Sequence, residues 1–156
     1  MRSVERAIRR SRGFTLIELV ITISIIAILA AVALPRYITL QTQARAAKTQ
    51  AIFGGVRSAA ALAHAQAIAS NTVTSATVSM EGVNVDQVNG YPAATNTGII
   101  TALQLDATGD QVTITSAPPT VTLDIVGGTS PNCRVTYTEA AALNTSPVIT
   151  SVTSGC

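Results

Sequence analysis

Residues 14–35 read FTLIELVITISIIAILAAVALP, and Glu18 is the only charged residue among them. In a helix that rises 1.5 Å per residue, roughly twenty apolar residues cover the roughly 30 Å hydrocarbon core of a bilayer. A carboxylate inside such a segment costs about 2.5–3.5 kcal/mol at mid-bilayer on insertion scales, and less near an edge. The stretch therefore predicts a membrane-spanning helix whose single acid requires an explanation.

Charge is distributed unevenly along the chain. Residues 1–13 hold five arginines against one glutamate, a net charge of +4, whereas residues 14–156 hold five basic and seven acidic side chains. A basic tip followed by an apolar run is the signal that keeps this end of a chain in the cytoplasm. The rest of the chain has no basic patch that would attract nucleic acid, so no such partner is expected.

The helix is predicted to continue beyond the apolar run, because residues 36–69 are rich in Ala, Gln, Leu and Arg, which favour helices. A helix from Phe14 to about Ala69 would be about 84 Å long at 1.5 Å per residue. A domain of this size cannot bury so long a helix. Half of it is therefore expected to protrude into lipid or into other subunits.

Pro35 and Gly54-Gly55 are the weak points of this predicted helix. Proline removes one backbone donor and clashes with the preceding turn, so a kink or local melting is expected near Pro35. Two glycines in mid-helix indicate either a looser turn or the close approach of a neighbouring backbone. A stripe of mostly small residues also recurs at spacings near three and four, formed by Leu40, Ala44, Ala47, Ala51, Gly54, Gly55, Ser58, Leu62 and Ala65.

From residue 70 the composition changes to short runs in which Ser and Thr alternate with apolar residues. Glu81-Gly82 lies between two such runs and predicts a hairpin, and residues 97–105 predict a short helix. Further strands are expected near residues 111–116, 120–126, 133–138 and 148–152. The alternation predicts an α+β fold, in which a four-stranded antiparallel sheet packs one face on the upper half of the long helix.

Cys133 and Cys156 are the two cysteines of the chain. In an exported protein such a pair indicates a disulfide, worth about 3 kcal/mol on the chain-entropy model, with two free buried thiols as the alternative. The single histidine, His64, is far from both, so no metal site is expected and a packing or surface role is assigned to it. No nucleotide-binding, hydrolase or metalloprotease motif is present, which argues against an enzyme and against a cofactor.

Three interpretations compete for the N-terminal segment. A secretory signal peptide would use Ala31-Val32-Ala33 as its cleavage site. A simple anchor helix would explain Glu18 locally, because Thr15 at the N-cap and an acid three residues later form a capping box near the positive end of the helix dipole. In the third interpretation the chain is cut just before Phe14, and the carboxylate of Glu18 compensates the positive charge of the new amino terminus.

The stretch RGFTLIELVITISIIAILAAVALP (residues 12–35) resembles the N-terminus of type IV prepilins and of the pseudopilins of type II secretion. The matching features are a short basic leader that ends in Gly13, followed by Phe14, Thr15, Leu16, Glu18 and Pro35. The resemblance implies cleavage between Gly13 and Phe14 by a membrane prepilin peptidase, and N-methylation of Phe14. It also implies residence in the inner membrane, until an assembly platform and a cytoplasmic ATPase move the subunit into a helical filament.

Glu18 acquires an expected role from this resemblance. Cleavage would create a cationic amine on Phe14 in the same apolar environment, and a buried carboxylate needs such a partner. The amine can reach Glu18 of its own helix or Glu18 of an adjacent subunit. In the second case the pair would set the register of the bundle, as a buried polar group does in coiled coils. We favour the pair between subunits, with a purely local role as the alternative.

The C-terminal half carries a finer resemblance. Residues 89–106, NGYPAATNTGIITALQLD, together with CRVTYTEA from Cys133 and the final Cys156, resemble the mannose-sensitive haemagglutinin class of type IV pilins. A pseudopilin is the alternative, but major pseudopilins carry a calcium-binding acidic loop. Here only Asp106 and Asp110 are close in sequence, whereas Ca²⁺ takes about six to eight oxygens. A second alternative is a soluble exported binding domain with a conventional signal peptide.

The sequence therefore predicts a structural subunit of a type IV pilus, used for attachment, with motility or DNA uptake as further uses. Residues 1–13 are expected to be a leader that is removed, and residues 14–35 the transmembrane and filament-core half of the helix. Residues 36–69 are its amphipathic half, and residues 70–156 a β-rich head. The expected partners are further copies of the chain, other pilins, the peptidase, the platform with its ATPase, and membrane lipid before assembly. The expected final location is an extracellular pilus.

Overall fold

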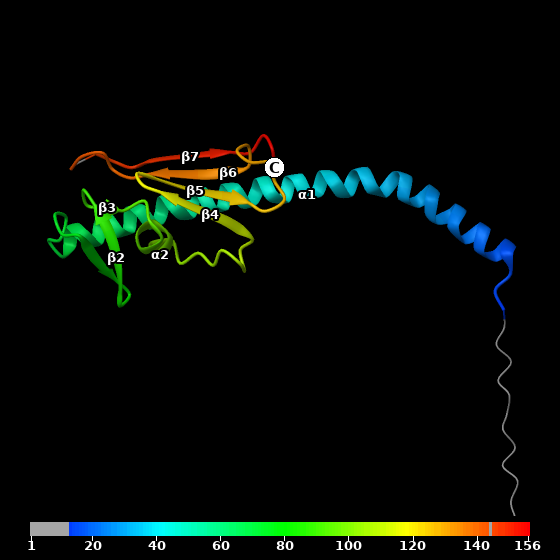
Figure 1. The fold of residues 1–156 in the computed structure, drawn as a ribbon, viewed down its shortest axis with the longest axis horizontal. Helices are drawn as coiled ribbons and strands as arrows, with labels where there is room; N and C mark the ends of the chain where they lie inside the picture. Colours follow the sequence, from blue (N-terminus) through cyan, green and yellow to red (C-terminus); the bar gives the residue numbers. More distant parts are fainter. Residues whose placement is uncertain (1–12, 144) are drawn as a thin grey trace, which may run out of the picture. The chain divides into compact units, whose positions relative to one another are not determined.

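A long helix and a β-rich head make up the part of the chain that the structure describes, residues 13–143 and 145–156 of a computed structural model (Figure 1). The helix, α1 (Leu16–Ala69), is unbroken over 54 residues. The chain divides into two units, Met1–Thr39 and Leu40–Cys156, and α1 contributes to both. The predicted long helix is therefore confirmed, with its start two residues later than expected. The predicted leader, residues 1–13, lies outside the described residues except for Gly13.

The first part of α1 is open to its surroundings, because every described residue before Arg45 is exposed. Among the described residues α1 is the one helix that is long and apolar enough to cross a membrane, judged by length and composition. Its hydroxyl groups bond to its own backbone. Thr22 Oγ1 donates to the carbonyl of Glu18 at 2.7 Å, and Ser24 Oγ to that of Val20 at 2.7 Å. These two hydroxyl groups are thus satisfied without outside partners, as an apolar environment requires.

Pro35 lies inside α1 and does not melt it. Proline has no N–H, so the hydrogen bond to the carbonyl of Ala31 is missing from the helix. Nearby, Thr39 Oγ1 donates to the carbonyl of Pro35 at 3.0 Å. The kink at Pro35 stays a prediction.

Four antiparallel strands form the larger sheet (Figure 1). In spatial order they are β4 (Val112–Ala117), β5 (Thr120–Ile125), β6 (Arg134–Thr138) and β7 (Val148–Val152). Alternate residues face inward: Val121, Leu123 and Ile125 of β5 are buried, as are Val135 and Tyr137 of β6. This is the period of two that a half-buried strand imposes. The predicted four-stranded antiparallel sheet on the helix is confirmed.

A smaller sheet follows α1 and consists of β1 (Thr77–Met80), β2 (Val83–Val88) and β3 (Tyr91–Pro92). Its two tight turns, Glu81-Gly82 and Asn89-Gly90, have positive φ at both central residues, as type I′ hairpin turns require. The hairpin at Glu81-Gly82 was predicted, whereas β3 was not. A two-residue strand that includes a proline carries no alternation to detect.

Two short helical segments, η1 (Asn96–Ile100) and α2 (Thr101–Leu103), stand where the sequence predicts a short helix. Gly98 permits the tight path of η1, because a Cβ there would lie 2.2 Å from the carbonyl oxygen of Ala93. Gly55 of α1 faces α2, and a Cβ at Gly55 would lie 3.0 Å from Cδ1 of Leu103, whereas Gly54 has open space. A neighbour therefore does approach Gly55 closely, but it is the side chain of Leu103 and not a backbone.

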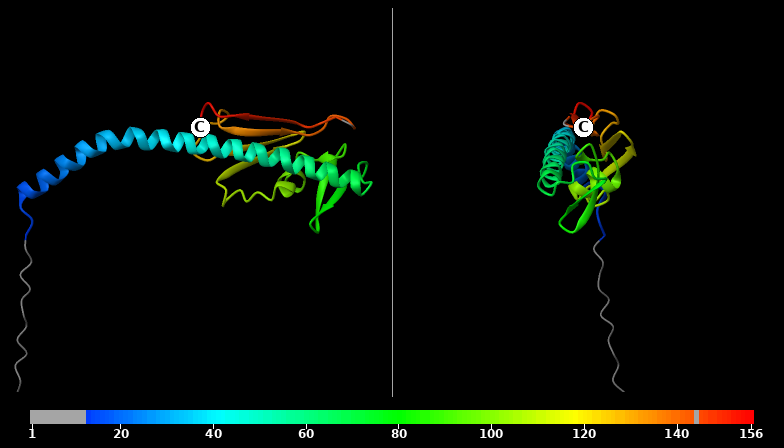
Figure 2. Two further views of the ribbon diagram at one scale, coloured as in Figure 1. Left: turned by 180° about the vertical axis from the view of Figure 1, so that it is seen from behind. Right: turned by 90° about the vertical axis from the view of Figure 1, so that its left-hand side faces the viewer.

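The larger sheet lies along one side of the second part of α1 (Figure 2). The residues of α1 that are buried there are not those of the stripe of small residues. The buried residues of α1 are Thr49, Ile52, Val56, Ala59, Ala60, Ala63 and Ala67. Every member of the stripe except Gly55 is exposed. Alanine occurs on all sides of this segment, so small-residue spacing does not distinguish one face from another. The large β-branched residues Ile52 and Val56 do distinguish the buried face. They join Val121 and Leu123 of β5 in the main core.

Candidate functional site

The start of α1 forms the candidate site. Gly13 and Phe14 precede the helix, both are exposed, and the side chain of Phe14 is 71% exposed. A peptide bond that lies outside regular structure and is exposed is one that a peptidase can reach. Glu18 follows Phe14 by four residues, which is about one helical turn.

Thr15 and Glu18 bond to each other at the beginning of the helix. The backbone N–H of Glu18 donates to Thr15 Oγ1 at 3.2 Å. The backbone N–H and the hydroxyl of Thr15 donate to Glu18 Oε2 at 3.5 and 3.3 Å. This reciprocal arrangement is a capping box, and it holds a carboxylate near the positive end of the helix dipole. The local explanation of Glu18 is therefore present in the uncleaved chain.

Glu18 keeps capacity for a further partner. Within the described ranges its hydrogen bonds use Oε2 alone, and it belongs to no ion pair; the ion pair present there joins Arg134 to Asp124. A carboxylate has about four acceptor positions. A cationic donor brought close to Glu18 would thus find free acceptors in an apolar setting.

The surface around Glu18 is apolar and uncovered. Its exposed large apolar side chains are Leu16, Ile17, Leu19, Val20, Ile21, Ile23, Ile25, Ile26, Ile28, Leu29, Val32 and Leu34. Monomeric soluble proteins rarely expose a contiguous apolar patch larger than a few hundred Å². The segment is therefore built to be covered, by lipid or by other protein chains.

At one end of the head the disulfide Cys133–Cys156, whose Cα atoms lie 4.8 Å apart, packs against α1. Thr49 of α1 is fully buried against it, with Oγ1 at 3.6 Å from Sγ of Cys133 and 3.4 Å from Sγ of Cys156. Arg45 donates to the carbonyl of Cys156, and Lys48 to the carbonyl of Asp110. One turn of α1 thus fixes two loops. Sequence reasoning missed this role of Arg45 and Lys48, because backbone carbonyl partners leave no trace in the sequence.

Tyr137 and Glu139 connect the larger sheet to β3 and to the segment that follows it. The Tyr137 hydroxyl donates to the carbonyl of Pro92 at 2.6 Å, and Glu139 Oε2 accepts the N–H of Ala94 at 2.8 Å. Burial raises the pKa of Tyr137 above its ordinary value, and the nearby Glu139 and Tyr91 add to the rise. Glu139 is half-buried, and its carboxylate anchors this backbone amide.

His64 has a packing role. Its ring stacks on Tyr91 with centroids 4.0 Å apart and planes 8° apart, and its Nδ1 lies 2.8 Å from the carbonyl oxygen of Gly90. Asp106 and Asp110 also serve the fold, because they accept backbone N–H groups within their own loop. In the described part of the chain no group of three or more His, Cys, Asp or Glu side chains is placed to hold a metal.

Comparison with known proteins agrees with this geometry. Residues 8–34 match the family model of the prokaryotic N-terminal methylation motif. The chain is 37% identical over 116 residues to the type IV narrow pilus major component PilA5 of Thermus thermophilus, and the match covers 74% of this chain and 97% of the relative. No solved structure matches the chain significantly.

A methylation motif at the start of an uncovered apolar helix, which continues into a β-rich head, is the arrangement expected of a pilin. The chain belongs to the type IV pilin family. It is a pilin subunit that assembles into a polymer, and it is not an enzyme. Its apolar N-terminal helix fits a membrane-anchored precursor that later enters a pilus.

Proposed function

We propose that the chain is a prepilin that is cut between Gly13 and Phe14, N-methylated on Phe14, and polymerised through α1. The observation that carries this proposal is the start of α1. An exposed Gly13–Phe14 bond stands one turn before Glu18, within the matched methylation motif and beside the uncovered apolar surface. Residues 1–13 are then the leader, residues 14–35 the membrane and filament-core segment, residues 36–69 the amphipathic half of the helix, and residues 70–156 the head.

Before assembly the precursor spans the inner membrane with its basic tip in the cytoplasm. Five arginines within residues 1–13 support this orientation, because basic residues beside an apolar span stay on the cytoplasmic side. The partners at this stage are a prepilin peptidase and an assembly platform with its ATPase. Pro35 removes one hydrogen bond from the middle of α1. We therefore assign the bending or stretching of the helix during assembly to this position.

After cleavage the new amine of Phe14 pairs with Glu18 of an adjacent subunit. The free acceptor capacity of Glu18 supports this role, as does the absence of another cation beside it in the described residues. Pairing offsets the cost of burying the carboxylate among apolar side chains. A lone ionic pair in an apolar seam also fixes the stagger of neighbouring helices, because any other register leaves the charges unpaired.

Two substitutions at Glu18 separate this role from helix capping. Glu18→Gln keeps the capping box, since Gln serves at that position as well as Glu, but removes the charge. Glu18→Ala removes both. We expect both variants to be processed and both to lose filaments, measured as pilin in fibres sheared from cells. Filament levels that stay normal in Glu18→Gln and fall in Glu18→Ala would assign the residue to capping alone.

The filament serves surface attachment, with motility or DNA uptake as further uses, and its subunit is of the mannose-sensitive haemagglutinin class. The subclass rests on NGYPAATNTGIITALQLD and on the Cys133–Cys156 loop. The relative PilA5 is named a major pilus component, which supports a major rather than a minor role here. Sheared fibres in which this chain dominates would establish the major role. Attachment that free mannose does not reduce would contradict the subclass.

A further inference from the structure

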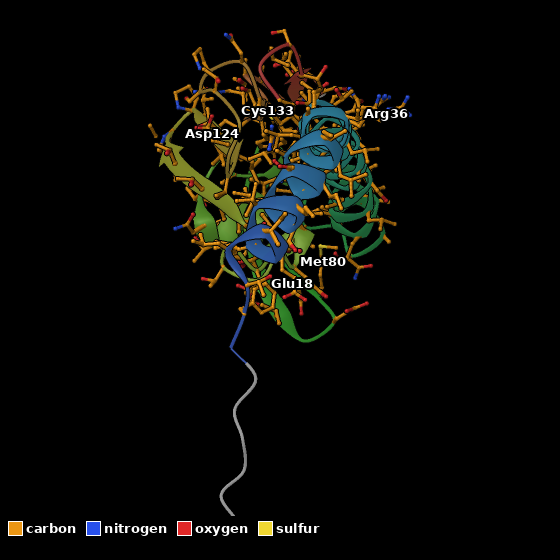
Figure 3. All side chains as sticks on the ribbon, turned by 90° about the vertical axis from the view of Figure 1, so that its right-hand side faces the viewer. Glu18, Arg36, Met80, Asp124 and Cys133 are labelled. Carbon is orange, nitrogen blue, oxygen red and sulfur yellow. A yellow bond between two sulfur atoms is a disulfide. The ribbon has the colours of Figure 1, made fainter. Side chains whose placement is uncertain are left out.

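Two opposite edges of the head carry complementary features. At one edge the β1–β2 turn projects beyond α1, on the side away from β7 (Figure 1). Glu81 is exposed at its tip, and Val83, the next residue but one, is 52% exposed. Met80, which pairs with Val83 across the turn, lies at the edge away from Cys133 (Figure 3). The tip thus presents one carboxylate beside an apolar side chain.

The other edge holds a hollow of about 290 Å³ between α1 and the start of β7. Its walls include Arg57, His64, Tyr91, Pro147 and Ile149. The stacked rings of His64 and Tyr91 and the bond from His64 Nδ1 to the Gly90 carbonyl make this wall rigid. Arg57 is exposed, lies 5.7 Å from the ring centroid of Phe53, and pairs with no acid among the residues described. The hollow thus presents one unpaired cation beside apolar surface.

Glu81 and Arg57 lie at different flanks of α1 and form no ion pair within the described chain. Glu81 lines a hollow together with Leu62, whereas Arg57 lines the hollow beside His64. Glu81 accepts one hydrogen bond from Gln104 Nε2 at 3.1 Å, a neutral donor, and pairs with no cation in the described ranges. The hollow is at the small end of the size range of ligand pockets, which suits a side chain better than a free ligand. A second copy supplies both the missing charge and a turn of matching character.

We propose that the β1–β2 turn of one copy docks in the Arg57 hollow of the next copy, with the Glu81 carboxylate facing the Arg57 guanidinium. This inference rests on the proposed function, because it describes a contact within the polymer. The two patches differ, so the contact is heterologous, and a repeated heterologous contact builds an open filament rather than a closed dimer. The ionic pair sets which edge meets which, and the apolar side chains around it exclude water.

A substitution at Glu81 can remove the carboxylate without disturbing the turn. Glu81 has φ of 50°, a left-handed conformation that Asn adopts more readily than Glu. Glu81→Asn therefore removes the charge while it suits the turn, and the head should unfold at the same temperature as the parent or higher. Asp106→Asn is the matched control. It removes an exposed carboxylate elsewhere on the head, and its side-chain oxygen can still accept the Thr108 N–H.

The test measures pilin in sheared fibres from cells that carry the full chain. Glu81→Asn, Glu81→Arg and Arg57→Glu are each expected to reduce fibres by about tenfold, with Asp106→Asn at the parental level. The double variant Glu81→Arg with Arg57→Glu should restore them, because it rebuilds the pair with reversed signs. Parental levels in all single variants, or failure of the double variant to recover, would overturn the proposal. If the unchanged chain forms no fibres, the proposed function itself fails, which is a distinct result.

Cross-linking gives an independent readout. Glu81→Cys with Arg57→Cys, treated on intact fibres with a short bis-maleimide, should give a ladder of multimers on non-reducing gels. Each single cysteine variant should give no ladder. Dimers alone, or no cross-linked species, would contradict a heterologous contact between these two edges.

Discussion

The two parts of α1 are both rich in apolar residues, yet their surroundings are opposite. Every residue of α1 before Arg45 is exposed, although the segment carries large Ile, Leu and Val side chains. Between Thr49 and Ala67 seven residues are buried, and four of them are alanines. Small side chains let the sheet approach the helix closely, whereas the large side chains of the first part stay exposed among the residues that the structure describes.

Apolar composition therefore indicates which surface must be covered, but it does not indicate what covers that surface. For the second part of α1 the cover is the sheet β4–β7, supplied by the same chain. For the first part, the cover that we propose is lipid before assembly and other pilin helices afterwards. Substitutions in the two parts should therefore affect different quantities: head stability in one, assembly in the other.

Matched leucine substitutions give the largest expected contrast. Leu123 is 0% exposed in the core, and Leu29 is 64% exposed on the first part of α1. Leu123→Ala should lower the free energy of unfolding of the head by about 2–5 kcal/mol, because it leaves a cavity. Leu29→Ala should change it by less than about 0.5 kcal/mol. Denaturant titration of the full chain in detergent, followed by tyrosine fluorescence, measures both, and equal losses would refute the contrast.

Removal of the disulfide should have the next largest effect. Cys133→Ser with Cys156→Ser frees the C-terminal loop and should cost the head about 3 kcal/mol on the chain-entropy model. The contact of both sulfurs with Thr49 is also lost. Amide exchange should accelerate in β6 and β7 and stay unchanged in residues 16–34. Faster exchange in that first part of α1 would mean that the disulfide also supports the helix outside the head.

Tyr137 should make the head sensitive to high pH. Its pKa is raised in the folded state, by burial first and then by Glu139 and Tyr91, above an unfolded value of about 10. The unfolded chain therefore loses this proton first, so the stability is fully present below pH about 10 and falls as the pH rises further. Denaturant midpoints measured from about pH 8 to about pH 11, on both sides of the unfolded pKa, follow the decline.

Tyr137→Phe is the control for that decline. It should cost about 1–3 kcal/mol at neutral pH, because the Pro92 carbonyl loses its buried donor. It should also flatten the loss of stability above pH about 10. An unchanged slope in the variant would assign the sensitivity to other groups.

The smallest effect is expected at the start of α1. Thr15→Ala removes the acceptor of the Glu18 N–H and should speed exchange of that amide by about fivefold, which corresponds to about 1 kcal/mol of capping. Thr22→Ala is the control, because Thr22 donates to the Glu18 carbonyl and does not cap the helix. Equal acceleration in both variants would show that the first turn is held by something other than the capping box.

Much of the fold could be predicted because the decisive patterns are local. Alternation of Val, Leu and Ile with Thr indicated the positions of β4 to β7, and Glu81-Gly82 indicated the first hairpin. The motif around Glu18 also lies within a short stretch, and the two cysteines, which are 23 residues apart, have no other cysteine in the chain to pair with. These features depend on backbone periodicity and turn chemistry, which nearby residues specify.

The features that escaped prediction depend on tertiary contacts. The stripe of small residues did not identify the buried face of α1, because the sheet selects the face that presents Ile52 and Val56. Glu139 meets the N–H of Ala94 only after β6 and the segment following β3 come together. Arg45 and Lys48 bind carbonyl oxygens that every residue possesses. Such pairings carry no residue signature in the sequence.

The mass of the mature N-terminus tests the central claim most directly. Pilin sheared from the cell surface would be digested, and its first peptide identified by tandem mass spectrometry. We predict a chain that begins at Phe14 and carries one methyl group on its α-amine. A chain that begins at Leu34, after Ala31-Val32-Ala33, would contradict the account, because the first part of α1 and Glu18 would then be absent from the filament.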